Sequence, residues 1–125
     1  MGLDMDFYKL PKENGTRSYF DLLELDSYKY FRKNYTIHEI MCLSKELEEC
    51  NCKRIDQFRL LPYPYLFGAS SYKIAKKQYE YIKKILMAKD LKRYVKDYDE
   101  IDNPQQLLEI LKDFDKYDFY YQWCN

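Results

Sequence analysis

The stretch Leu3-Asp4-Met5-Asp6-Phe7-Tyr8-Lys9-Leu10 decides the fold, together with the closing stretch Tyr117-Asp118-Phe119-Tyr120-Tyr121-Gln122-Trp123. Apolar and polar residues alternate over the first five positions of the opening stretch, which is typical of a half-buried strand. Pro11 and Gly15 then mark its end. We interpret the closing stretch as a second strand, and we expect the two terminal strands to pair in one sheet.

Helical patterns follow the opening strand. Ser27 predicts the cap of a first helical stretch that runs to about Asn34. Thr36 and Glu39 stand at the N-cap and N3 positions of a capping box, which predicts a second helix. One continuous helix over 27–49 is the alternative, and the pattern leaves both open. Helical spacing places five residues on the buried stripe: Ile37, Ile40, Met41, Ser44 and Leu47.

The remaining segments are less regular. Residues 19–25 fit either a strand or a helical turn, and 60–68 contain two prolines, which predicts an extended edge strand or a packed loop. Ser70-Ser71 predicts the cap of a helix to about Ala88, and Asn103-Pro104 predicts the start of a last helix. Strands and helices therefore mix without regular alternation. This predicts a small α+β domain over 1–125, with a short antiparallel sheet that includes both terminal strands and is covered by three or four helices.

Composition narrows the class of protein. A chain of 125 residues is expected to form one domain, and its 46% apolar and 34% charged residues exclude a disordered or membrane-spanning chain. No apolar run reaches the roughly 18 residues of a spanning helix, and the N-terminus lacks the pattern of a signal peptide. We therefore expect a soluble, cytoplasmic protein.

Charge is balanced overall, with 21 basic and 21 acidic residues, which argues against a nucleic-acid binder. The distribution is uneven, because the charged residues of 72–96 are mostly basic and those of 97–118 are mostly acidic. Either two solvated helix faces attract one another, or the basic segment offers a surface for phosphates or an acidic partner. The fifteen tyrosines fit interface anchors as well as ordinary core use.

His38 is the only histidine, and it follows the basic pair Arg32-Lys33 closely. If Thr36 caps the helix, backbone N–H groups and this pair form an anion site at which His38 can titrate. The alternative is a surface or half-buried histidine at a helix start.

No other pattern indicates catalysis, a metal or a cofactor. The spacing of Cys50 and Cys52 is too short for the usual metal clasp, so we expect the four cysteines to be free and mostly structural. With three glycines the chain has no phosphate-binding loop, and it has no hydrolase or metalloprotease motif. Asp4 and Asp6 share one face of a strand, as a metal-binding pair does, but such acids usually contact only water.

Four short blocks, taken in order, resemble a family of small phage-borne proteins that opens with Met-Gly-Leu-Asp-Met, closes with Tyr-Tyr-Gln and has no established activity. The blocks are 1–5, 30–34 with Ile37-His38, 65–68 and 118–122. The chain departs from the family at Asp6, where an aromatic residue is usual, and in a shortened segment before Tyr63. The resemblance implies a phage or prophage accessory protein in the bacterial cytoplasm. It marks as candidate ligand-binding residues Arg32, Lys33, Asn34, His38, Tyr120 and Gln122.

The leading hypothesis is an accessory binding protein that engages a host protein or sequesters a small phosphate-bearing ligand. One alternative is a small enzyme that acts on a nucleotide or phosphoester, with His38 as acid/base and Arg32 as an anion clamp. Another is a structural or assembly protein of the phage particle. We expect Arg32, His38 and Gln122 to gather around one pocket, while the sequence leaves the oligomeric state open.

Overall fold

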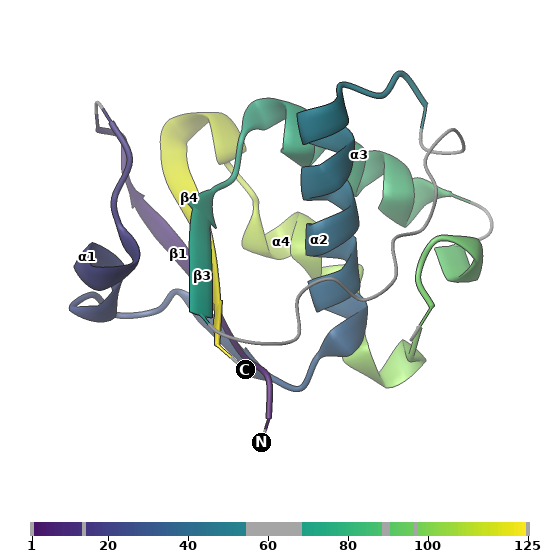
Figure 1. Ribbon diagram of the computed structural model, residues 1–125, viewed down its shortest axis with the longest axis horizontal. Coiled ribbons are helices and arrows are strands. Elements are labelled where there is room, and N and C mark those ends of the chain that lie inside the picture. Colours follow the sequence, from purple (N-terminus) through teal and green to yellow (C-terminus); the bar gives the residue numbers. More distant parts are fainter. Residues whose placement is uncertain (1, 14, 55–68, 89–90, 97, 125) are drawn as a thin grey trace. The chain divides into compact units, whose positions relative to one another are not determined.

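The computed structural model describes residues 2–13, 15–54, 69–88, 91–96 and 98–124 (Figure 1). These residues form two compact units. The sheet unit holds the described residues of Met1–Asn34, Tyr65–Ile74 and Glu109–Asn125, and the helical unit holds those of Tyr35–Pro64 and Ala75–Leu108.

The sheet unit is built on four antiparallel strands in the order β2-β1-β4-β3. The central pair consists of β1 (Asp4–Pro11) and β4 (Tyr117–Cys124), which pair along their whole lengths from Asp4↔Cys124 to Pro11↔Tyr117. The edges are β2 (Lys29–Arg32) and β3 (Ala69–Lys73). The predicted α+β class and the pairing of both terminal strands are confirmed.

The register separates two faces of the sheet, because successive side chains of a strand point to opposite sides. One face carries an aromatic cluster, in which the Phe7 and Tyr121 ring centroids lie 4.9 Å apart and Tyr121 stacks on Trp123 at 5.4 Å. The other face, which we call the α1 face, carries Asp4, Asp6, Tyr8 and Leu10 of β1 with their cross-strand partners on β2 and β4.

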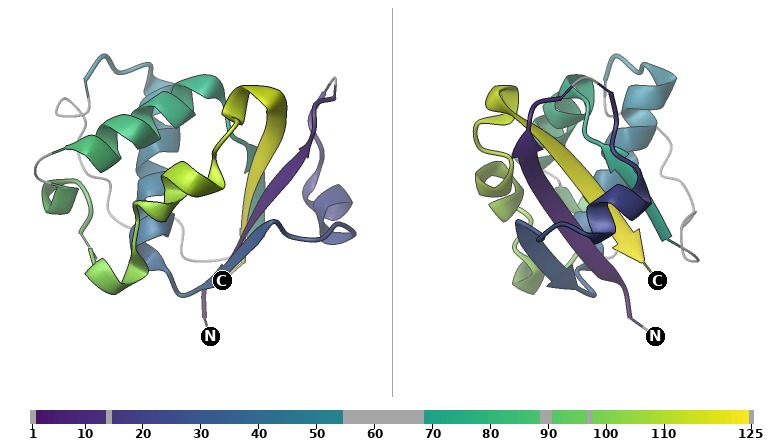
Figure 2. Two further views of the ribbon diagram at one scale, coloured as in Figure 1. Left: turned by 180° about the vertical axis from the view of Figure 1, so that it is seen from behind. Right: turned by 90° about the vertical axis from the view of Figure 1, so that its left-hand side faces the viewer.

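Helix α1 (Tyr19–Leu23) packs on the α1 face, in front of the strands in the right-hand view of Figure 2. Ser18 caps it, since Ser18 Oγ accepts the Asp21 N–H at 3.2 Å and Asp21 Oδ2 accepts the Ser18 N–H at 2.9 Å. Leu22 is fully buried in a cluster with Tyr8 and Tyr120. The ambiguous segment 19–25 therefore begins as a short helix, anchored by one leucine.

Both edge strands stand where the sequence predicts helices. Ser27 does not cap a helix, because Lys29–Arg32 pairs with β1 and Ser27 Oγ donates to the Lys29 carbonyl oxygen at 3.0 Å. Ser70-Ser71 lies within β3, and helix α3 (Lys76–Met87) starts later, with Ala75 at its N-cap. In both cases pairing with a central strand overrides the local capping signal.

The predicted second helix is confirmed as α2 (Tyr35–Cys50), but it begins before Thr36, so the predicted capping box is wrong. The helix predicted to run from Ser27 to about Asn34 and the continuous helix over 27–49 are also wrong, because Lys29–Arg32 is a strand. Thr36 Oγ1 instead donates to Asp102 Oδ2 at 2.7 Å and accepts the Asp99 N–H at 2.9 Å. Glu39 Oε2 accepts the Lys96 N–H at 2.6 Å. The predicted buried stripe is confirmed for all five residues, from Ile37 to Leu47.

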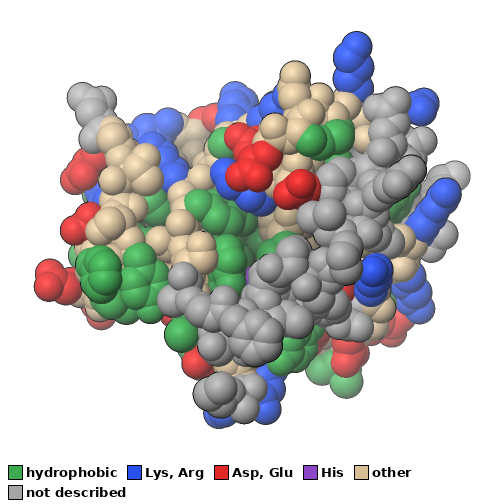
Figure 3. Space-filling view, in the orientation of Figure 1, with side chains coloured by type: hydrophobic (Ala, Val, Ile, Leu, Met, Phe, Trp, Pro, Cys, Tyr) green, Lys and Arg blue, Asp and Glu red, His purple; other side chains and the backbone are tan. Residues whose placement is uncertain are grey.

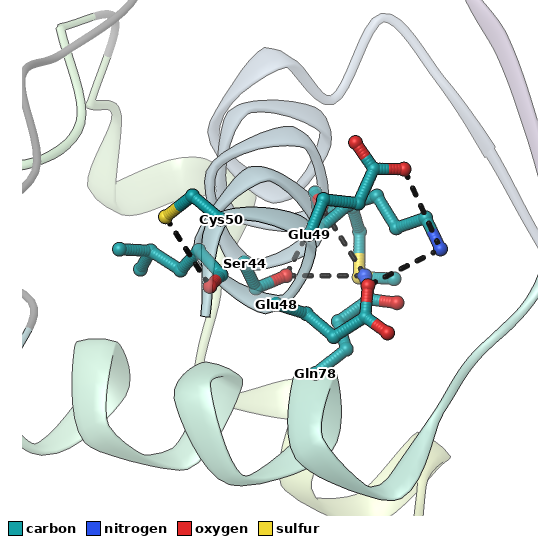
Figure 4. A network of polar contacts seen from close by, with 8 residues as sticks. Ser44, Glu48, Glu49, Cys50 and Gln78 are labelled. Atoms are coloured by element: carbon teal, nitrogen blue, oxygen red, sulfur yellow. Dashed lines mark hydrogen bonds and ion pairs between the residues drawn. The ribbon is translucent and has the colours of Figure 1, made fainter. Parts of the chain in front are cut away.

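A buried polar contact joins α2 to α3 (Figure 4). Gln78 Nε2 donates to the Met41 carbonyl oxygen at 3.3 Å and to Ser44 Oγ at 3.2 Å. Three short 3-10 helices and α4 complete the described elements: η2 (Leu91–Arg93), η3 (Glu100–Asp102), α4 (Gln106–Ile110) and η4 (Phe114–Lys116). The predicted strand or loop at 60–68 lies outside the described residues.

Cys50 and Cys52 form a disulfide at the end of α2, so the prediction of free cysteines is wrong for this pair. Cys42 and Cys124 are free, as predicted. The Cys-x-Cys spacing is too short for the usual metal clasp, but the turn after α2 brings the two Cα atoms to 5.5 Å, which suits a disulfide.

We expect Thr36→Val to lower the free energy of unfolding by about 1–3 kcal/mol, since it removes the hydroxyl that accepts the Asp99 N–H and donates to the Asp102 carboxylate. Urea unfolding followed by circular dichroism measures the loss. Thr16→Val is the matched control, because Thr16 is exposed. Equal stability of the two variants would show that this contact does not hold the 99–102 segment to α2.

Candidate functional site

The sheet places three of the six predicted site residues on one face. Arg32 pairs with Asp4, Gln122 with Asp6 and Tyr120 with Tyr8. Since directly paired residues point to the same side, Arg32, Gln122 and Tyr120 all belong to the α1 face. Arg32 is exposed, whereas Gln122 and Tyr120 are buried.

Lys33 and Asn34 connect β2 to α2. Lys33 has a left-handed backbone (φ 57°) and its N–H donates to the Leu3 carbonyl oxygen at 2.6 Å, which ends the pairing of β2 with the N-terminal strand. The Lys33 side chain is exposed, and Asn34 is buried directly before α2.

His38 lies in the helical unit with its side chain buried, 1% exposed. Burial lowers the pKa of His38 to about 4, so the ring is neutral near pH 7. Its Nε2 atom lies 3.6 Å from Cys42 Sγ, and burial, followed by the charge of Glu39, raises the pKa of that thiol to about 12. The pair is therefore neutral, and the prediction that His38 titrates beside an anion fails for this physical reason.

The start of α2 already holds a carboxylate. The Thr36 N–H donates to Asp102 Oδ2 at 3.2 Å, in addition to the hydroxyl contact. A residue of the chain itself thus takes the negative position that helix N-termini favour. The expected gathering of Arg32, His38 and Gln122 around one pocket stays a prediction, because the first and last belong to the sheet unit and His38 to the helical unit.

Two residues of β4 fix the segment that leads into α1. Tyr120 Oη accepts the Arg17 N–H at 2.8 Å, directly before the Ser18 cap. Asp118 Oδ2 accepts the Glu13 N–H at 3.0 Å. Because β4 is one of the two central strands, these contacts attach the segment before α1 to the middle of the sheet.

Asp118 is also the centre of a charged cluster on the α1 face. Its carboxylate is buried, with Lys73 Nζ 3.2 Å from Oδ1 and Arg17 Nη1 3.9 Å from Oδ2. Arg17 in turn contacts Glu13 Oε1 at 3.0 Å and the Pro11 carbonyl oxygen at 3.2 Å. Next to this cluster is an open pocket of about 370 Å³, lined by Lys12, Glu13, Lys73 and Asp118.

Polar groups also line the α1 face near the chain ends. The Tyr30 hydroxyl donates to Asp4 Oδ1. Burial, with a smaller contribution from the neighbouring Asp4 charge, raises the pKa of Asp6, against a hydrogen bond from Ser27 that lowers it. Gln122 Oε1, next to Asp6 across the strand pair, is buried and has no hydrogen-bond partner among the described residues. Among all the residues that the structure describes, no three His, Cys, Asp or Glu side chains lie close enough together to hold a metal ion.

The outer side of the α1 segment exposes large apolar side chains. Phe20 is 76% exposed and Leu23 is 53% exposed, although Leu22, which lies between them in the sequence, is fully buried. We call this region the α1 surface; its exposed apolar residues are Phe20, Leu23, Leu25, Tyr28 and Tyr30. Figure 3 shows hydrophobic side chains gathering over α1 with acidic ones beside them.

Sequence reasoning missed the α1 surface because it left 19–25 ambiguous between strand and helix. The signal was present: Ser18 followed by Asp21 at N3 is a capping-box arrangement. A helix that starts at this cap buries Leu22 against Tyr8 and Tyr120 and leaves Phe20 and Leu23 exposed to solvent. The bonds that fix the approach to α1, from the Glu13 N–H to Asp118 and from the Arg17 N–H to Tyr120, carried no local signal, because each joins residues about a hundred positions apart.

No family model, curated protein or solved structure matches this chain. The resemblance to small phage-borne proteins therefore stays a prediction. None of the described helices is long and apolar enough to span a membrane.

We expect stability to fall as the pH drops from about 6.5 towards 4. The unfolded chain binds a proton at His38 in this window and the folded chain does not, so the loss from this group approaches about 3 kcal/mol. Urea unfolding at several pH values measures the free energy of unfolding of the wild type and of His38→Gln. The difference between the two curves isolates His38, since all other groups titrate in both proteins. Parallel curves for the two proteins would contradict a buried, neutral His38.

Proposed function

We propose that this chain is a phage-encoded accessory binding protein that engages a host protein through the α1 surface. The observation that carries the proposal is the exposure of five large apolar side chains within residues 20–30, on a segment that buries only Leu22. Contiguous exposed apolar area costs solubility and commonly marks a protein interaction site. Phenylalanine and tyrosine supply large contact area with few rotatable bonds, which suits an interface core.

The α1 surface is held ready for binding. The Ser18–Asp21 capping box orders the start of α1, Leu22 anchors it between Tyr8 and Tyr120, and the Arg17 N–H ties it to β4. A surface ordered before binding loses less conformational entropy in the complex.

The charged residues of the α1 surface indicate what kind of partner surface would bind there. Asp21, Glu24 and Asp26 are exposed among the apolar residues, and the sequence has no lysine or arginine from 18 to 28. A basic group lies at the Tyr28 end of the surface, where Lys9 Nζ is 5.2 Å from the centroid of the Tyr28 ring. The complementary partner surface is apolar with a rim of basic side chains, because opposite charges at a rim speed encounter and select the partner.

Sequestration of a phosphate-bearing ligand is a second candidate, supported by the two lysines, Lys12 and Lys73, at the open pocket next to Asp118. The neighbouring carboxylates oppose an anion there, so we rank it second. The enzyme alternative gains no support, because His38 is buried and neutral near pH 7.

The test begins with photo-crosslinking in host cells, using a photoreactive phenylalanine analogue at position 20 and, separately, at position 101. Ile101 is 90% exposed and lies in the helical unit, so it reports random contact. We expect a discrete crosslinked partner only from position 20. The purified partner then enters calorimetric titrations with variants of the chain.

Phe20→Asp and Leu23→Asp should each weaken binding of the purified partner at least tenfold, and Ile101→Asp should leave it unchanged. Neutralising Asp21, Glu24 and Asp26 to amides should slow association and flatten its salt dependence. If Phe20→Asp and Ile101→Asp bind equally, the α1 surface is not the interface. If phosphate-bearing ligands instead bind and Lys73→Gln abolishes that binding, sequestration is the better account.

A further inference from the structure

A disulfide closes the end of α2, far along the chain from the α1 surface. Cys50 is the last residue of the helix, and Cys52 follows after a single residue, Asn51. Cys50 is exposed and Cys52 half-buried, and the sequence continues with two basic residues, Lys53 and Arg54, both exposed. Cys50 is thus open to reagents in solution, and two basic residues follow the pair in the sequence.

Backbone hydrogen bonds that do not involve the sulfur atoms also hold the turn between the two cysteines. Asn51 adopts a left-handed conformation (φ 55°), its N–H donates to the Glu48 carbonyl oxygen at 3.2 Å, and the Cys52 N–H donates to the Leu47 carbonyl oxygen at 3.2 Å. These two hydrogen bonds are the Schellman arrangement that ends many helices, and asparagine is the commonest substitute for glycine at its left-handed position.

The cysteine Cα atoms lie 5.5 Å apart, a usual separation for a disulfide. Because the Schellman hydrogen bonds involve only backbone atoms, they can persist after reduction and keep the two thiols close. The disulfide then re-forms readily, because each thiol is held at a high effective concentration next to the other. Its oxidation is therefore expected to be reversible.

From this geometry we propose that Cys50–Cys52 is a thiol–disulfide exchange site whose co-substrates are dithiols and disulfides, small molecules or proteins. A thiolate of an external dithiol attacks the exposed Cys50 Sγ. A bond forms between the two sulfurs, the Cys50–Cys52 bond breaks, and its electron pair leaves with Cys52 as a thiolate.

The basic residues after Cys52 favour this direction of attack. Lys53 and Arg54 follow Cys52 directly in the sequence, and neighbouring cationic residues favour the thiolate form of a cysteine. Cys50 Sγ instead lies 3.5 Å from the Leu47 carbonyl oxygen at the negative end of the helix, where a departing thiolate is disfavoured (Figure 4). The second thiol of the external dithiol then acts as a thiolate. It attacks the sulfur that the same dithiol contributes to the mixed disulfide, and this releases Cys50 as a thiolate. The external dithiol is oxidised to a disulfide, both cysteines are reduced, and the two thiolates take up the two protons that the external thiols have lost.

The first experiment equilibrates the full chain with reduced and oxidised dithiothreitol and counts free thiols by alkylation and mass spectrometry. Both states are measured in the variant Cys42→Ser/Cys124→Ser, which we call the background protein. In this variant every thiol that is counted comes from Cys50 or Cys52. We expect a reversible two-electron transition, with unchanged circular dichroism in both states. A pair that stays reduced under all oxidising mixtures, or that oxidises only between molecules, would overturn the proposal.

The second experiment measures the dithiothreitol-driven reduction of insulin disulfides. The background protein should raise the rate at least severalfold over the same protein with Cys50→Ser/Cys52→Ser, which still folds if the Schellman hydrogen bonds are sufficient. Equal rates would overturn the exchange activity.

Asn51 supplies a matched test of the backbone's role. Asn51→Gly retains the left-handed conformation, while Asn51→Val disfavours it, so Val should make the disulfide about tenfold easier to reduce than Gly. Equal reduction equilibria in the two variants, with helicity retained, would show that the backbone does not hold the pair together.

Discussion

The pairing of the two chain ends is the constraint on which the sheet unit depends. Strands β1 and β4 pair along their full lengths in the middle of the sheet, and each edge strand has only one of them as its neighbour. The pairing closes nearly the whole chain into one loop, which costs conformational entropy. The burial of Phe7, Tyr120 and Tyr121 on the two faces offsets that cost.

The proposed binding surface depends on the same pair. Two side chains of β4, Asp118 and Tyr120, accept backbone N–H groups from Glu13 and Arg17, and so hold the approach to α1. Leu22 then provides the only fully buried side chain of the helix. The apolar residues around it point outward because the sheet cannot accommodate more than this narrow stripe of so short a helix.

In the helical unit, buried polar side chains join segments rather than form a reactive centre. Thr36 and Glu39 bond to Asp99, Asp102 and Lys96, and Gln78 bonds to α2. Each contact satisfies a buried donor or acceptor that would otherwise cost free energy. His38 fits this pattern, since burial keeps it neutral. Polar residues of types common in active sites therefore serve the packing of this unit.

The sequence by itself determined the two central strands, the α+β class and the buried stripe of α2, because alternation and helical spacing are strong where an element is buried on a well-defined side. It did not determine the edge strands at 29–32 and 69–73, whose few exposed residues carry weak patterns. Of the six predicted site residues, the register places Arg32, Tyr120 and Gln122 on one face, and their role as a ligand site stays a prediction. Only the tertiary structure decided that α1 lies on that face, that His38 is buried and that Asp118 is a centre of contacts, because each depends on partners distant in sequence.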